Sequence, residues 1–98
     1  MAIKKGCLTK ERKELIRKRL NRISGQVNGL KKMVDDDRYC LDILQQISSV
    51  HEALRGAGKV LMRNYLEVCA TNAIRSKKEE KQDQIYNELM EIIYKFAK

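Results

Sequence analysis

The feature that most constrains the fold is a row of apolar and small residues that recurs every three or four positions over about eight helical turns, with no proline to interrupt it. The row consists of Cys40, Leu44, Ile47, His51, Leu54, Gly58, Leu61, Tyr65 and Val68. This pattern predicts one long helix over residues 40–69, which in a 98-residue chain must pair along its length with other helices. Gly56 and Gly58 lie almost midway along it, where a second helix can approach closely.

Two further helices are predicted, one on each side of this long helix. Thr9 can cap the first, which ends near residues 35–37, and Asp36 or Asp37 is expected to cap the second. The apolar positions of the first helix are Ile16, Leu20, Ile23, Val27, Leu30 and Val34. Residues 75–84 are expected to form a polar link and residues 85–98 a third helix. The sequence therefore predicts a single all-α domain over residues 1–98, with residues 1–8 as a flexible arm and a second copy covering its exposed apolar surface.

The charge of the chain indicates an anionic partner. It has 21 Lys and Arg against 13 Asp and Glu, a formal net charge of +8, and many of the basic residues fall in the first helix. Charge alone does not choose between DNA, RNA and an acidic membrane surface. No apolar run is long enough to cross a bilayer and the first residues do not resemble a secretion signal, so we expect a cytoplasmic protein without a membrane partner.

Three cysteines in a reducing compartment are expected to bind metal, to undergo redox chemistry or to pack, rather than to form structural disulfides. Cys40 and Cys69 would lie roughly 43 Å apart on one helix, given a rise of about 1.5 Å per residue, and cannot meet within a chain. Antiparallel pairing of two such helices around Gly56 and Gly58 would bring Cys40 of one chain level with Cys69 of the other. The alternative is that both cysteines pack as small apolar residues.

Cys7 and His51 are two other side chains that could act as metal ligands. Cys7 is interpreted as an incidental residue of the arm, and the alternative is a third thiol that resolves an oxidised site. His51 has no partner at helical spacing for a metal site and is interpreted as a core or interface residue.

Over residues 12–96 the sequence resembles the CsoR/RcnR family of bacterial metal- and sulfur-responsive repressors. The motifs that carry the resemblance are Arg19-x-x-Arg22-Ile23-x-Gly25-Gln26, Tyr39-Cys40, Gln45-Gln46-Ile47-Ser48 and Asn64-x-Leu66-Glu67-x-Cys69. The resemblance implies a three-helix protomer, an antiparallel four-helix-bundle dimer, a dimer-of-dimers tetramer and repression through operator DNA. The DNA-binding residues that it implies are Arg12, Arg19, Arg22, Gln26 and Lys59.

This sequence differs from the copper-sensing members of the family at the effector-binding site. Those members bind Cu(I) through a cysteine at the position of Cys40 in one subunit and a His-x-x-x-Cys pair in the other, and here Tyr65 replaces that histidine. A phenol, with an ordinary pKa of about 10, must lose its proton to become a good ligand and is then a harder donor than imidazole. Members that lack the histidine and keep both cysteines resemble the CstR-like persulfide sensors, in which reactive sulfur species link the two thiols.

We therefore favour a repressor whose Cys40 and partner-chain Cys69 are modified by persulfide or polysulfide, with no cofactor required. The alternative is a Cu(I)-responsive repressor with Cys40 and Cys69 as metal ligands, because Tyr39 and Glu88 match positions that support the histidine in copper-sensing relatives. An alternative of another class is an architectural nucleic-acid-binding protein with structural cysteines. An enzyme is disfavoured, because these residues offer no charge relay, phosphate loop or open metal triad.

Overall fold

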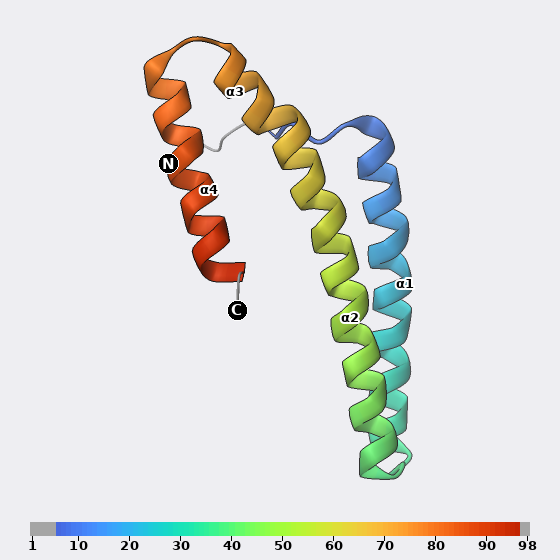
Figure 1. Cartoon of the computed structure of the whole chain (residues 1–98). Helices are drawn as coiled ribbons and strands as arrows, with labels where there is room; N and C mark the ends of the chain where they lie inside the picture. Colours follow the sequence, from blue (N-terminus) through green and yellow to red (C-terminus); the bar gives the residue numbers. More distant parts are fainter. Residues whose placement is uncertain (1–5, 97–98) are drawn as a thin grey trace, which may run out of the picture. The chain divides into compact units, whose positions relative to one another are not determined.

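A computed structural model describes residues 6–96, which form helices and short links without a strand (Figure 1). The elements are α1 (Lys10–Asp35), α2 (Cys40–Asn64), the π-helix η1 (Tyr65–Ala70), α3 (Thr71–Arg75) and α4 (Glu79–Phe96). Two compact units are distinguished by their contacts and are described separately: the hairpin unit, residues 8–63, and the C-terminal unit, which joins residues 6–7 to residues 64–96. Over the described residues, no helix combines the length and apolar character needed to cross a membrane. The all-α prediction is confirmed, and the predicted arm lies outside the described residues up to position 5.

The hairpin unit begins with the predicted cap. Thr9 Oγ1 accepts a hydrogen bond from the backbone N–H of Arg12 at 3.3 Å, which satisfies one of the donors that a helix leaves unpaired in its first turn. The prediction that Asp36 or Asp37 caps the second helix is wrong. Asp36 instead ends α1, with its N–H bonded to Lys32 O at 2.9 Å, and Asp37 turns the chain with a φ of 53°. A short aspartate tolerates this left-handed conformation better than most residues.

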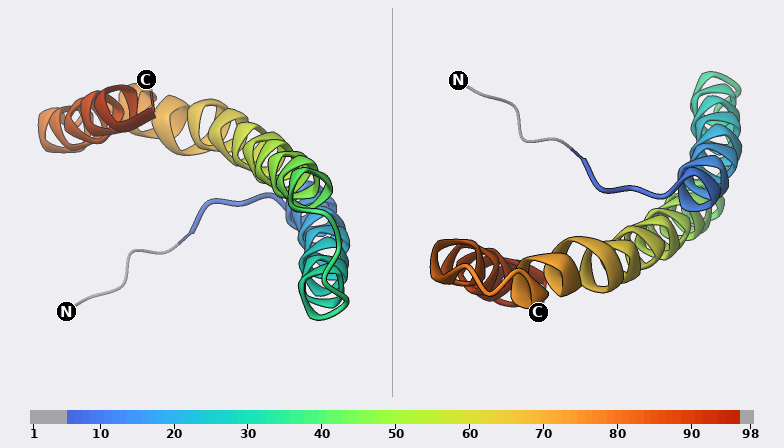
Figure 2. Two further views of the ribbon diagram at one scale, coloured as in Figure 1. Left: turned by 90° about the horizontal axis from the view of Figure 1, so that it is seen from below. Right: turned by 90° about the horizontal axis from the view of Figure 1, so that it is seen from above.

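Helices α1 and α2 run antiparallel in Figure 1 and are joined at residues 36–39, and Figure 2 shows this hairpin from below and from above. The apolar stripe predicted for α1 divides into two rows, each with a spacing of seven residues. Ile23 is buried and Ile16 and Leu30 are half-buried, whereas the other three members are exposed. Those exposed members are Leu20, Val27 and Val34. Helix α1 therefore packs through one row within the chain and leaves the second row at the surface.

Helix α2 divides in the same way. Val50 and Ala57, which the sequence-based row did not include, are 8% and 6% exposed and form the core of the hairpin with Ile23. The predicted row itself lies mostly at the surface, where Leu44, Ile47, Leu54 and Leu61 are 58%, 48%, 47% and 49% exposed. We call these four side chains the α2 apolar row. Gly56, next to the buried Ala57, lies beneath Arg19, because a Cβ built there would come within 3.0 Å of the guanidinium Nη1.

In the C-terminal unit the helical backbone continues past the predicted end at residue 69 through η1 into α3. Helix α4 begins at Glu79, six residues before the predicted start, so the polar link shortens to residues 76–78, where Lys77 has a φ of 59°. Gln82 Nε2 donates to Ile74 O at 2.9 Å and ties α4 to the end of α3. Ala70 and Ile85, at 3% and 7% exposed, form the apolar core of this unit.

Candidate effector site

Cys69 lies in the π-helical segment η1, where the helix is wider than an α-helix. The hydroxyl of Thr71 donates to Leu66 O at 2.9 Å, across the five-residue step of this wider turn. Cys69 itself is half-buried. Single π-turns inside helices are rare and occur frequently at functional sites. The backbone conformation therefore supports a functional role for the segment that contains this predicted sensor thiol.

Cys69 is bonded to Cys7 in a disulfide within the chain, with the two Cα atoms 5.9 Å apart. Asn64 holds the N-terminal segment in place, because its Nδ2 donates to Cys7 O at 3.2 Å. Asn64 is only 2% exposed, so this amide would be costly to bury without the bond. The interpretation of Cys7 as an incidental residue is wrong, since a disulfide to Cys69 and a hydrogen bond from Asn64 hold it. The expectation that the cysteines do not form a disulfide is wrong for the same pair.

Tyr65 and Glu88, two residues predicted to support the thiols, contact each other directly. Tyr65 Oη donates to Glu88 Oε2 at 2.7 Å. Burial, the hydrogen bond to Glu88 and the negative charge of that carboxylate, in this order of size, raise the pKa of Tyr65 well above its ordinary value. The phenol therefore keeps its proton at neutral pH.

These side chains border a shared hollow on the C-terminal unit. Residues lining it include Cys7, Tyr65, Cys69, Lys81, Gln84 and Glu88. Among residues 6–96, no group of three or more His, Cys, Asp and Glu side chains is arranged to hold a metal ion. The cysteine sulfurs that border the hollow are those of Cys7 and Cys69.

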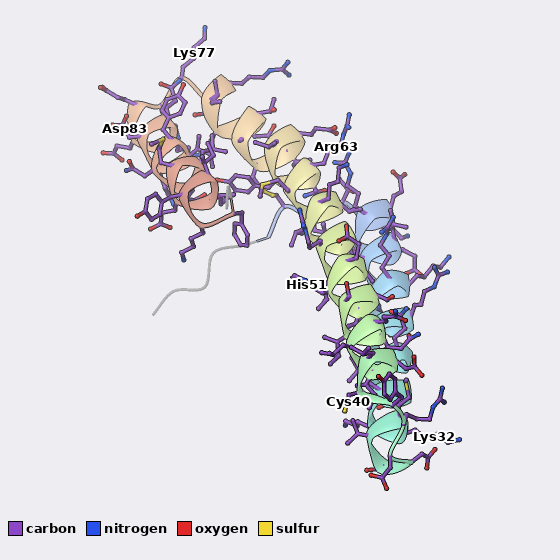
Figure 3. All side chains as sticks on the ribbon, turned by 60° about the horizontal axis from the view of Figure 1, so that its bottom comes forward. Lys32, Cys40, His51, Arg63, Lys77 and Asp83 are labelled. Atoms are coloured by element: carbon purple, nitrogen blue, oxygen red, sulfur yellow. A yellow bond between two sulfur atoms is a disulfide. The ribbon has the colours of Figure 1, made fainter. Side chains whose placement is uncertain are left out.

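The second predicted sensor thiol, Cys40, is a free and exposed cysteine at the first residue of α2 (Figure 3). It belongs to the hairpin unit, near the turn, as does Tyr39, which is 66% exposed. His51, interpreted from the sequence as a core or interface residue, is exposed in the single chain. The structure thus brings Tyr65, Glu88 and Cys69 together in one unit and leaves Cys40 and Tyr39 in the other.

The residues predicted to bind DNA are all in the hairpin unit. This unit has thirteen Lys and Arg against seven Asp and Glu, a net charge of +6, whereas residues 64–98 have six of each. Arg19, Arg22 and Lys59 are exposed and Arg12 is half-buried. Gln26 is half-buried, and its Oε1 is buried without a hydrogen-bond partner among the described residues.

Comparison with known proteins places this geometry in a family. A family model described as metal-sensitive transcriptional repressor matches residues 12–95. The chain belongs to the metal-sensitive transcriptional repressors. The predicted resemblance to the CsoR/RcnR family is thereby confirmed, and so is the prediction that the chain is not an enzyme, since its relatives are repressors.

The relatives of this repressor are copper sensors by name. It is 42% identical over 86 residues to the copper-sensing transcriptional repressor CsoR of Bacillus subtilis, covering 88% of this chain and 82% of that one. It is also 42% identical over 64 residues to the copper-sensing repressor RicR of Mycobacterium tuberculosis, covering 65% and 67% of the two chains. The crystal structure of the copper-sensing repressor CsoR with Cu(I) from Geobacillus thermodenitrificans aligns with a TM-score of 0.81 and 47% identity, over 99% of this chain and 95% of that one.

The disulfide can be checked in the purified protein. Without reductant, we expect trypsin to release residues 6–10 covalently joined to residues 64–75, while Cys40 is alkylated in the peptide of residues 39–55. Because both cysteines belong to one chain, the protein should migrate as a monomer on a non-reducing denaturing gel. Alkylation of Cys7 before reduction, or a covalent dimer linked through Cys7 or Cys69, would contradict the intrachain pairing; a Cys7→Ser variant is the control for assigning the linked peptide.

Proposed function

We propose that this protein is a transcriptional repressor that binds operator DNA through the hairpin unit and releases it when Cu(I) binds at Cys69. The observation that carries the proposal is the sulfur of Cys69 at a π-turn of a chain whose relatives are named copper-sensing repressors. Soft thiolate ligands favour Cu(I) over harder cations. The exposed thiol of Cys40 is the second candidate ligand, supplied by a second copy.

The copper proposal replaces the reactive sulfur species that we favoured from the sequence. The absence of a histidine at position 65 argued for sulfur sensing, but relatives over nearly the whole chain are named for copper. A sulfur-responsive repressor remains the second candidate, because Cys7 and Cys69 are close enough for direct exchange. A polysulfide would convert one thiol to a persulfide, and attack by the second thiol would form the disulfide and release hydrogen sulfide.

The effector is tested by DNA binding of the fully reduced protein under anaerobic conditions. We expect one equivalent of Cu(I) per chain to weaken operator binding at least about tenfold, a coupling of about 1.4 kcal/mol. Cys69→Ala should abolish this response and keep the DNA affinity of the metal-free protein, since Cys69 lies outside the basic hairpin unit. Lys95→Ala, which changes an exposed residue of α4, is the control and should respond normally.

Two other results would change the proposal. Release of DNA by a polysulfide donor and not by Cu(I) would favour the sulfur-responsive repressor. DNA binding that responds to neither effector would favour the architectural nucleic-acid-binding protein with structural cysteines.

The second part of the proposal is that a second copy covers the α2 apolar row. Four large apolar side chains, each about half exposed, lie along one side of α2, and a single chain has no further helix in the hairpin unit to cover them. Two copies of α2 packed antiparallel through these rows would form the four-helix dimer, and pairing of dimers would form the tetramer. In such a dimer Cys40 of one copy lies level with Cys69 of the other.

Replacement of one row residue tests the assembly. Leu54→Glu places a charge in the proposed interface, so we expect sedimentation velocity at micromolar concentration to show a shift from dimer or tetramer towards monomer. Gln45→Glu is the matched control, because Gln45 is exposed nine residues earlier on α2, half a turn around the helix. An assembly that is the same size in both variants would contradict the α2 interface.

The third part of the proposal is that the basic side chains of the hairpin unit bind the DNA backbone. Arg22 is exposed on α1, the helix with the most positive charge, and Lys59 is exposed on α2. Each lysine or arginine that neutralises a phosphate releases counterions, so such contacts make the affinity strongly dependent on salt. This mode of binding needs no helix-turn-helix and reads the shape of the DNA as much as its bases.

Charge removal tests the location of this surface. Arg22→Ala should weaken binding to operator and unrelated DNA alike and reduce the slope of log K against log salt by about one per bound chain. Lys95→Ala removes an exposed charge from the neutral C-terminal unit and should leave both quantities unchanged. Equal effects of the two variants would show that the hairpin unit is not the specific DNA-binding surface.

A further inference from the structure

We propose that Cys7 is a ligand of the effector metal: in the reduced protein, Cys7 and Cys69 of the same chain bind one Cu(I) together. This inference rests on the proposed function and adds a sulfur that the sequence-based site of Cys40 and Cys69 did not contain. It makes the N-terminal segment part of the sensor.

Cys7 lies close to Cys69 in the C-terminal unit. The two Cα atoms lie 5.9 Å apart, so the sulfurs of Cys7 and Cys69 can approach one small ion without movement of the backbone over a large distance. Asn64, which is 2% exposed, holds the segment there through the hydrogen bond from its Nδ2 to Cys7 O. This bond does not involve the sulfur atoms, so it can persist when the disulfide is reduced.

Tyr65 also borders the hollow, but its hydroxyl is already hydrogen-bonded to Glu88. Its hydroxyl donates a hydrogen bond to Glu88 Oε2 at 2.7 Å, and a protonated phenol is a weak ligand for a soft metal ion. A thiolate also suits Cu(I) better than any oxygen donor on the border of the hollow. Cys7 therefore supplies the soft donor at the hollow that Tyr65 does not supply.

The disulfide and the metal site are alternative states of the same two sulfurs. A dithiol reductant breaks the S–S bond by thiol exchange, which supplies two electrons and two protons and leaves Cys7 and Cys69 as thiols and the reductant as its own disulfide. Each thiol then loses its proton as Cu(I) binds. In the disulfide form neither sulfur is a thiolate, so that form does not bind Cu(I) at this site.

The full-length protein, reduced and then freed of reductant under anaerobic conditions, is loaded with Cu(I) alone. X-ray absorption at the copper edge counts the sulfur neighbours, and competition with a chromophoric Cu(I) chelator measures affinity. We expect Cys7→Ser to lose one sulfur neighbour and at least about tenfold in affinity, and Cys40→Ala to retain the pair formed by Cys7 and Cys69. Gly6→Ala is the control that should match the wild type, because a Cβ at Gly6 meets open space, and Tyr65→Phe tests the phenol as the alternative ligand.

The outcomes separate this inference from the function on which it rests. If Cys7→Ser binds Cu(I) with the wild-type number of sulfurs and the wild-type affinity, Cys7 is not a ligand, while copper sensing through Cys69 still stands. If Tyr65→Phe loses affinity and Cys7→Ser does not, the phenol is the ligand and the assignment is overturned. If the wild type fails to bind Cu(I), the proposed function itself fails and the metal site fails with it.

Discussion

The hairpin unit can bury only one of the two apolar rows on each of its long helices, and this constraint governs the rest of the fold. Two helices packed side by side share one interface, which is filled here by Ile23, Val50 and Ala57. The remaining apolar side chains of α2 stay at the surface, where exposure to water is unfavourable by roughly 25 cal/mol per Å² of apolar area. A second copy with the same row is the simplest cover, because a two-fold interface is complementary to itself.

In the C-terminal unit, the two cysteine sulfurs are bonded to each other, and the phenol of Tyr65 is bonded to a carboxylate instead. Cys7 joins Cys69 across the hollow, whereas the hydroxyl of Tyr65 is directed to Glu88. This division matters for metal selectivity, since thiolates prefer Cu(I) and a protonated phenol prefers a hydrogen-bond acceptor. The π-turn of η1 contains both Tyr65 and Cys69, so the wider turn lies at the border of the hollow.

The proposed DNA-binding residues and the sulfur pair belong to different units of the chain. Control of DNA binding by an effector therefore requires a free-energy coupling between the units, and about 1–3 kcal/mol is sufficient to change operator occupancy. The effector must bind the two conformations of the repressor with different affinities for such a coupling to exist. A site could combine one sulfur from the N-terminal segment, one from η1 and one from a second copy. Such a site would bind the effector with different affinities in the two conformations, because only a conformation that brings all three sulfurs together would bind it tightly.

Local patterns were sufficient to predict much of this protein. Seven-residue and three- or four-residue spacings determined that the chain is helical, and the hydroxyl of Thr9 before a polar first turn determined where α1 begins. Resemblance to a known family drew attention to Tyr65 and Glu88, which the structure joins by a hydrogen bond. The basic character of α1 was equally visible, because net charge does not depend on the fold.

Only the tertiary structure decided which apolar row is buried, where α4 begins and what Cys7 contacts. Periodicity identifies the apolar side of a helix but not its neighbour, so it could not show that Val50 and Ala57, rather than the predicted row, pack against α1. A polar sequence that looked like a link became the first turns of α4, because contacts such as Gln82 to Ile74 stabilise it there. Cys7 and Cys69 are 62 residues apart in the sequence, a distance over which no local pattern connects two thiols, and their contact depends on where the chain places its N-terminal segment.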